Sequence, residues 1–321
     1  MKRKGILRLC CVLLIFACIT TSAFAGVDQN ATTLKDVEST LNQYIENTYS
    51  IEPGSSEYVE FLTNQLMFRE DAQLTTRPDY DELELYAGIY LSEVNSPEST
   101  VIKDLDNGTQ AVLLNDEFLA KSLDQAKKEI ESSNLEDLQG INQGGVSPFA
   151  AYSPSKAADY AMQYWEDYNT PEYPKFVSDC TNFVSQCARA GGKAFKKPTD
   201  YMSKPAAYEN NNYWYSHHYL DWQPTHKYKQ STSFIRVKDF YTYWKNHGAT
   251  VINCSTNCAL RDKIKVGDIV QLADSSGSWF HSIIISCKKD GSWRYAAHTS
   301  NHKWKTVSSI IGASKYRIIR L

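Results

Sequence analysis

Cys180 is the residue of this sequence whose surroundings best suit covalent chemistry. It follows Asp179, a common helix N-cap type, and a Gly191-Gly192 pair offers a left-handed stop. Between them, apolar residues recur at helical spacing: Phe183, Val184, Cys187 and Ala188. A cysteine in the first turn of a helix meets unpaired backbone N–H groups and the positive end of the helix dipole, which favour the nucleophilic thiolate. The alternative is that Cys180 simply extends the buried apolar stripe.

Two histidines supply a possible partner. His281 lies near the start of a predicted strand, Trp279–Cys287, and His298 near the end of the next, Ser292–His298. Antiparallel neighbours bring the start of one strand beside the end of the other, so both histidines are expected at one edge of a sheet. A thiolate on a helix, an imidazole on a strand and a polar group on the adjacent strand form the constellation of a cysteine hydrolase. Either histidine alone would more often be an ordinary strand residue.

The elements that must position these groups indicate a mixed α+β fold. Further strands are predicted at 266–272 and 315–321, with turns at 275–277 and 290–291. Helices are predicted from Tyr152 onward and over Ser233–His247. The resulting C-terminal domain, 152–321, would pack a cysteine-bearing helix on an antiparallel sheet.

The segment between these helices, 196–244, is rich in Tyr and Trp without a regular period. Aromatic rings with polar tips suit a groove for a peptide or a sugar polymer, although they also bury an irregular segment that lacks aliphatic residues. The two interpretations are evenly balanced. The residues that we expect to contact a substrate are Asp179, Asn182, Trp214 and Trp279.

Several of these motifs together resemble the putative amidase domain family. They are the run from Asp179 to Gln186 with Gly191-Gly192, the Gly267-Asp268 strand, Trp279-Phe280-His281-Ser282 and Ala297-His298-Thr299, preceded by Tyr164-Trp165 and Tyr168-Asn169. That family is similar in outline to the NlpC-type and CHAP cell-wall hydrolases, a papain-like superfamily. The resemblance covers 152–321 and implies a papain-like domain. It also implies Cys180 as nucleophile, His281 as general base and His298 as third residue, with Asn301 as the alternative third residue. No metal or organic cofactor is implied.

The N-terminal half carries no comparable chemistry. Residues 26–138 contain no cysteine or histidine and are predicted to form a small accessory α+β domain. Helices are expected over 34–45 and 57–70, then strands over 83–94, 99–105 and 110–118. Residues 26–150 hold 24 acidic and 7 basic residues, net −17, whereas 151–321 hold 13 acidic and 23 basic, net +10. The halves should therefore attract one another, unless these charges are only solvated surface.

Residues 1–25 have the features of a secretory signal peptide. Lys2, Arg3 and Lys4 precede an apolar run that is short for a membrane span, and Ala23-Phe24-Ala25 suits cleavage. The mature chain is thus expected outside the cytosol, secreted or associated with the cell wall, with no integral membrane segment. It would keep five cysteines, an odd number that leaves at least one thiol free. A glycine-containing linker is predicted at 139–151.

These features favour a secreted cysteine amidase or peptidase that cleaves amide bonds in peptidoglycan or in surface peptides. The substrate class follows from expected export and family likeness. Nucleic acid is not among the expected partners. Two alternatives remain: a non-catalytic module that binds an anionic envelope polymer, and a secreted cysteine protease that acts on proteins. Docking of the acidic domain onto the basic one is also expected.

Overall fold

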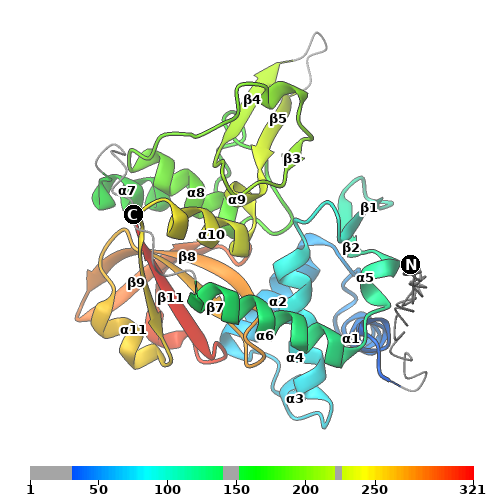
Figure 1. Ribbon diagram of the computed structural model, residues 1–321. Helices are drawn as coiled ribbons and strands as arrows, with labels where there is room; N and C mark the ends of the chain where they lie inside the picture. The colour runs from blue at the N-terminus through cyan, green and yellow to red at the C-terminus, as the bar shows by residue number, and fades with distance from the viewer. Residues whose placement is uncertain (1–30, 140–151, 221–225) are drawn as a thin grey trace, which may run out of the picture. The chain divides into compact units, whose positions relative to one another are not determined.

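A six-stranded antiparallel sheet organises the structure, a computed structural model that describes residues 31–139, 152–220 and 226–321 (Figure 1). The strand order is β10-β9-β8-β7-β11-β6. The bounds are β6 Thr250–Cys254, β7 Ile269–Ala273, β8 Trp279–Lys289, β9 Ser292–Ala297, β10 His302–Thr306 and β11 Lys315–Arg320. The predicted antiparallel run of β7, β8 and β9 is confirmed, and so is the mixed α+β class.

One face of this sheet packs on helices of the C-terminal half. They are α7 Pro154–Gln163, α8 Cys180–Ala190, α9 Thr232–Ile235 and α10 Val237–Asn246. Their apolar residues share a core with Ile269, Ile284 and Ile319 of the sheet. The single helix expected over Ser233–His247 is wrong in detail, because extended backbone at Arg236 separates α9 from α10. A further helix, α11 Asn257–Lys263, follows β6.

The N-terminal half is mainly helical. Its helices are α1 Leu34–Tyr49, α2 Ser56–Phe68, α3 Ala72–Thr75, α4 Tyr80–Glu93, α5 Asp116–Leu119 and α6 Leu123–Gln139. The predicted helices over 34–45 and 57–70 are confirmed as α1 and α2. The predicted hairpin is confirmed as β1 Thr100–Asp104 and β2 Gln110–Leu114, although β2 ends before the predicted residue 118.

The strand expected over 83–94 is wrong, since these residues belong to helix α4. The helix is buried almost all round, with apolar side chains at Leu83, Leu85, Tyr86, Ala87, Ile89, Tyr90 and Leu91. A helix without a solvent face loses the 3.6-residue alternation by which helices are recognised, and a short continuous apolar run then reads as a strand.

The N-terminal half covers the second face of the sheet. Apolar residues of α1, α2 and α4 form one continuous core with Val270, Leu272, Ile283 and Ile285 of the sheet. Residues 32–321 accordingly form one compact unit. The expected signal peptide, 1–25, and the expected linker beyond Gln139 lie outside the described residues.

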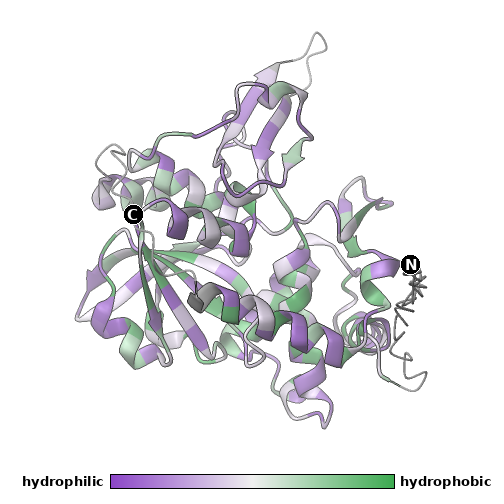
Figure 2. Ribbon diagram, viewed as in Figure 1, coloured by the Kyte–Doolittle hydropathy of each residue, from purple (hydrophilic) through white to green (hydrophobic). Residues whose placement is uncertain are grey.

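The aromatic segment contains a small second sheet. Strand order is β3-β5-β4, with bounds β3 Ala207–Tyr208, β4 Ser216–Leu220 and β5 His226–Ser231. This sheet projects from the rest of the structure and is largely hydrophilic, unlike the central strands (Figures 1 and 2). Short 3-10 turns lie at Tyr201–Ser203 and Val307–Ser309. Among the described residues, none of the helices combines the length and the apolar character that crossing a membrane requires.

Candidate active site

Cys180 is the first residue of α8 and is almost completely buried, with 2% of its surface exposed. Its sulfur lies 3.7 Å from Thr181 Oγ1 and accepts the backbone N–H of Ser282 in β8. Burial raises the pKa of the Cys180 thiol, and the N–H of Ser282 and the Thr181 hydroxyl offset only part of this effect. In this arrangement the group is therefore a neutral thiol, placed beside β8 at the helix N-terminus.

Asp179 supports the start of α8 in a different way from the expected N-cap. No N-cap hydrogen bond forms from its side chain to the helix backbone. Its carboxylate accepts hydrogen bonds from the Phe176 N–H at 3.0 Å and from Asn182 Nδ2 at 2.9 Å. The second oxygen lies 2.6 Å from His298 Nδ1. A fully buried carboxylate that is held by three groups is a scaffold for the loop before Cys180.

His298 completes this scaffold. Its Nε2 lies 2.6 Å from the Tyr164 carbonyl oxygen, which can only accept, so Nε2 donates. Its ring stacks on Phe183 of α8, with 3.9 Å between the ring centroids. Both ring nitrogens are thus engaged, one by Asp179 and one by Tyr164. His298 ties the end of α7, the start of α8 and the end of β9 together, on the α8 side of the sheet.

His281 lies on β8 with its ring toward the opposite face. It pairs with Leu272, whose side chain belongs to the core shared with the N-terminal half. The next residue, Ser282, instead shares a hydrogen bond of 3.0 Å with Thr181 in α8. Successive strand residues point to opposite faces, so the same register that turns Ser282 to α8 turns His281 away from it.

The environment of His281 is unusual for a histidine. The side chain is 1% exposed, and neither ring nitrogen has a hydrogen-bond partner within the described part of the chain. Burial lowers the pKa of His281 to about 3, and the charge of His302 contributes. The imidazole is therefore neutral, with a free lone pair, but it forms no hydrogen bond to Cys180 or to His298.

His302 is a neighbour of this site that sequence reasoning missed. Its Nε2 lies 2.8 Å from Ser300 Oγ, and its ring meets Phe68 of α2 edge-on. Burial lowers the pKa of His302 to about 4. The only sequence signal was its position four residues after His298. The alternative third residue, Asn301, is exposed.

The remaining predicted substrate contacts are spread over the domain. Asn182 is buried and donates to the Pro174 carbonyl oxygen at 2.8 Å, in addition to Asp179. Trp214 is fully buried, and its Nε1 donates to Ser185 Oγ at 3.3 Å. Both side chains are buried, and these contacts lie within the α8 layer. Trp279 is half-buried, with its Nε1 donating to Asn134 of α6 at 3.0 Å.

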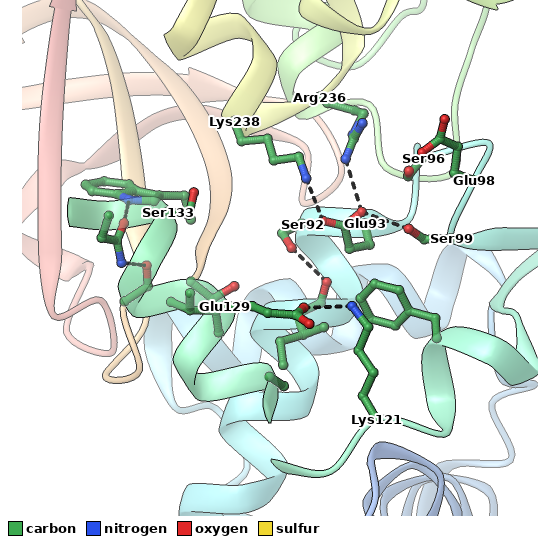
Figure 3. A pocket seen from close by; sticks show the side chains of 18 of the residues that line it. Ser92, Glu93, Ser96, Glu98, Ser99, Lys121, Glu129, Ser133, Arg236 and Lys238 are labelled. Atoms are coloured by element: carbon green, nitrogen blue, oxygen red, sulfur yellow. Dashed lines mark hydrogen bonds and ion pairs between the residues drawn. The ribbon is translucent and has the colours of Figure 1, made fainter. Parts of the chain in front are cut away.

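Trp279 lines a cavity of about 340 Å³ between α4, α6 and the start of α10. Figure 3 shows Glu93 in this cavity, bonded to Arg236 and Lys238, with Lys121 paired to Glu129. Cys180 and His281 do not line it. The Lys and Arg side chains that line it are paired with acidic side chains of the protein. The cavity is therefore a polar gap between the two halves of the chain.

The site does not suggest a metal centre. Across 31–139, 152–220 and 226–321, no three His, Cys, Asp or Glu side chains gather as metal ligands would. The five cysteines of these ranges are unpaired, with Cys187 buried and Cys258 exposed.

Comparison with known proteins places the chain in a family. A family model described as putative amidase domain matches residues 151–320, more than half of the chain. The chain therefore belongs to the putative amidase domain family, and this membership suggests amide hydrolysis. No curated protein and no solved structure matches the chain.

Proposed function

We propose that this protein is a cysteine-dependent amidase in which Cys180 is the nucleophile. The observation that carries the proposal is the position of Cys180 within the matched domain, at the first turn of α8 and beside the strand that bears His281. Backbone N–H groups at a helix start both favour a thiolate and can hold the oxyanion of an acyl-transfer intermediate.

In the proposed reaction the Cys180 thiolate attacks the amide carbonyl, and His281 first takes the thiol proton and then gives it to the leaving amine. Water then attacks the thioester, which releases the acid and regenerates the thiol. His281 is the better base because both nitrogens of His298 are already bonded, by Asp179 and by Tyr164. Since β9 ends at Ala297, the Ser282 N–H has no partner strand on that side and reaches the sulfur. Because the His281 ring points to the other face of β8, the proposed proton transfer requires a local rearrangement of this strand that brings the imidazole to the sulfur.

The substrate that we propose is a peptide amide at the cell surface, and peptidoglycan is the preferred candidate. This choice rests on the expected signal peptide and on family membership. A secreted protease that acts on proteins and a non-catalytic envelope-binding module are the alternatives.

The test is incubation with purified muropeptides, followed by mass spectrometry for products that have gained one water. Cys180→Ser should abolish hydrolysis while the fold is kept, because a hydroxyl is far less acidic than a thiol. Cys187→Ser is the matched control on the same helix. It places a hydroxyl in the core and should cost on the order of 1–3 kcal/mol of stability without removing the chemistry. Normal turnover by Cys180→Ser would overturn the assignment of the nucleophile.

A further inference from the structure

The proposed catalytic pair is closed to solvent. Cys180 and His281 are 2% and 1% exposed, and neither lines the cavity near Trp279. An amide substrate must reach both the sulfur and the imidazole, so this arrangement does not admit one. Cys180 lies on the α8 face of the sheet, and the N-terminal half covers the opposite face, to which His281 points.

Helix α4 of the N-terminal half lies against β8 and the turn that precedes it. The approach is so close at Gly88 that a Cβ there would lie 1.8 Å from Asp274 Oδ2 and 3.2 Å from Ser278 Cβ. Ser275 Oγ also donates to the Glu84 carboxylate of α4. The face of β8 that carries His281 is thus sealed by a helix from outside the amidase domain.

A residue just after α4 is hydrogen-bonded to the loop that precedes Cys180. Asn95 Nδ2 donates to the Ser178 carbonyl oxygen at 2.7 Å and to the Ile235 carbonyl oxygen at 3.0 Å. Ser178 is two residues before the cysteine. The neighbouring Glu93 pairs with Arg236 at 3.0 Å and with Lys238 at 3.1 Å, as Figure 3 shows.

Helix α2 contacts the residues that follow β9 and the loop before β11. Ser300 Oγ donates to Asn64 Oδ1, and Phe68 packs on His302, the residue that helps to lower the pKa of His281. The backbone N–H of Gly312 donates to the Met67 carbonyl oxygen at 3.0 Å, which holds the end of α2 against the loop before β11. The N-terminal half therefore contacts the loop before Cys180, the residues that follow β9 and the loop that precedes β11.

We propose that residues 32–139 are an intramolecular inhibitor that covers the His281 face of β8 and holds the loop before Cys180, and that substrate is excluded until the contacts of α2 and α4 are released. This inference rests on the proposed function. The covered state agrees with it chemically, since burial raises the pKa of Cys180 and lowers that of His281, so neither group is charged. Release would rehydrate His281 and free the loop before Cys180, so that water reaches the sulfur and favours the thiolate.

The test uses the full chain and the reactivity of its own thiols. Asn95→Ala removes both hydrogen bonds beside Cys180 without touching the catalytic pair, and alkylation by iodoacetamide is followed residue by residue with mass mapping. Cys258 is the exposed reference and Cys187 the core reference. Asp116→Asn is the control variant, because it breaks only the exposed Lys35–Asp116 ion pair of the same half.

In the unaltered chain, Cys180 should react far more slowly than Cys258. Asn95→Ala should raise the alkylation rate of Cys180 about tenfold, the factor expected for losing one or two hydrogen bonds, and leave Cys187 unchanged. Asp116→Asn should change neither rate. Glu93→Gln, which weakens the pairs with Arg236 and Lys238, should also raise the alkylation rate of Cys180. It replaces Asn95→Ala in the test if that variant fails to fold.

Two results would overturn the inhibitor. One is a Cys180 that reacts as fast as Cys258 in the unaltered chain. The other is an equal rise at Cys180 and Cys187 in the variants, which signals global unfolding in place of release. Exposure of Cys180 without any muropeptide hydrolysis would support the cover and overturn the proposed function, so the two failures are distinguishable.

Discussion

At the scale of single residues, the two histidines of the amidase domain have different surroundings and hence different expected roles. His281 has two free ring nitrogens, whereas His298 is bonded through both to Asp179 and Tyr164. The first is suited to move a proton, and the second to hold the loop before Cys180 in place.

We therefore expect His281→Leu to abolish hydrolysis with little loss of stability, because leucine fills much of the buried volume and the two ring nitrogens form no bonds that would be lost. His298→Ala should lower the midpoint of urea unfolding, since it leaves the Asp179 carboxylate buried without its partner, a loss on the order of 3 kcal/mol. The comparison is made by unfolding both variants and measuring their turnover under identical conditions. Equal losses of stability would contradict this division of roles.

Asp274 is a second residue with a predictable effect. Burial, reinforced by the charge of Glu84, raises its pKa to about 7, against hydrogen bonds from Ser276 and from the Ser278 N–H that lower it. The unfolded carboxyl ionises near pH 4. The folded chain thus holds the proton more tightly, and stability falls as pH rises from about 4 to about 7 and is level above that range.

Asp274→Asn should remove this dependence. The variant keeps an oxygen for the Ser278 N–H and places an amide near Glu84, whose Oε1 has no hydrogen-bond partner among the described residues and lies 4.0 Å from Arg69 Nη2. At about pH 8 it should be more stable than the unaltered chain by on the order of 1–4 kcal/mol, with a smaller difference at about pH 5. Urea midpoints at both pH values measure it. Parallel pH profiles for the two proteins would refute the assignment.

At the scale of elements, helices and strands that have a solvent-exposed face were predicted well from the sequence. Helix α1 has apolar positions at the helical period, and the β1–β2 hairpin has the turn sequence Asp106-Asn107-Gly108, so their bounds were found within a few residues. Helix α4 was missed because it is buried on nearly every side. Strand periodicity also placed His281 and His298 near one edge of the sheet. It could not say which face each occupies, because the face depends on the register with β7 and on the contacts of α8.

Sequence patterns could not predict that the N-terminal half packs against the amidase domain near the proposed site. Charge suggested that the two halves attract one another, but the contacts beside Cys180 come from Asn95, an uncharged residue in a turn. The close packing of Gly88 on Asp274 is likewise invisible without coordinates, since a glycine in a helix carries no signal of what lies opposite.

At the scale of the whole molecule, the opposite charges of the halves, net −17 and net +10, should affect stability only at low salt. Exposed charges are largely screened beyond about 0.15 M, where the Debye length is about 8 Å, whereas the apolar core that joins the halves is not screened. Unfolding midpoints should therefore drop modestly from low salt to about 0.15 M and change little beyond. A steep continued fall towards 1 M would mean that charge, and not the shared core, holds the halves together.

The place of β11 in the sheet bears on how the protein is made. This strand comes last in chain order but lies between β7 and β6, and it pairs with both. During synthesis the sheet therefore stays divided until β11 has emerged, by which time α2 and α4 have long been available to fold. The face of β8 that carries His281 would thus be completed against helices that are already present, and a newly made chain would pass through no stage in which this face is both finished and open.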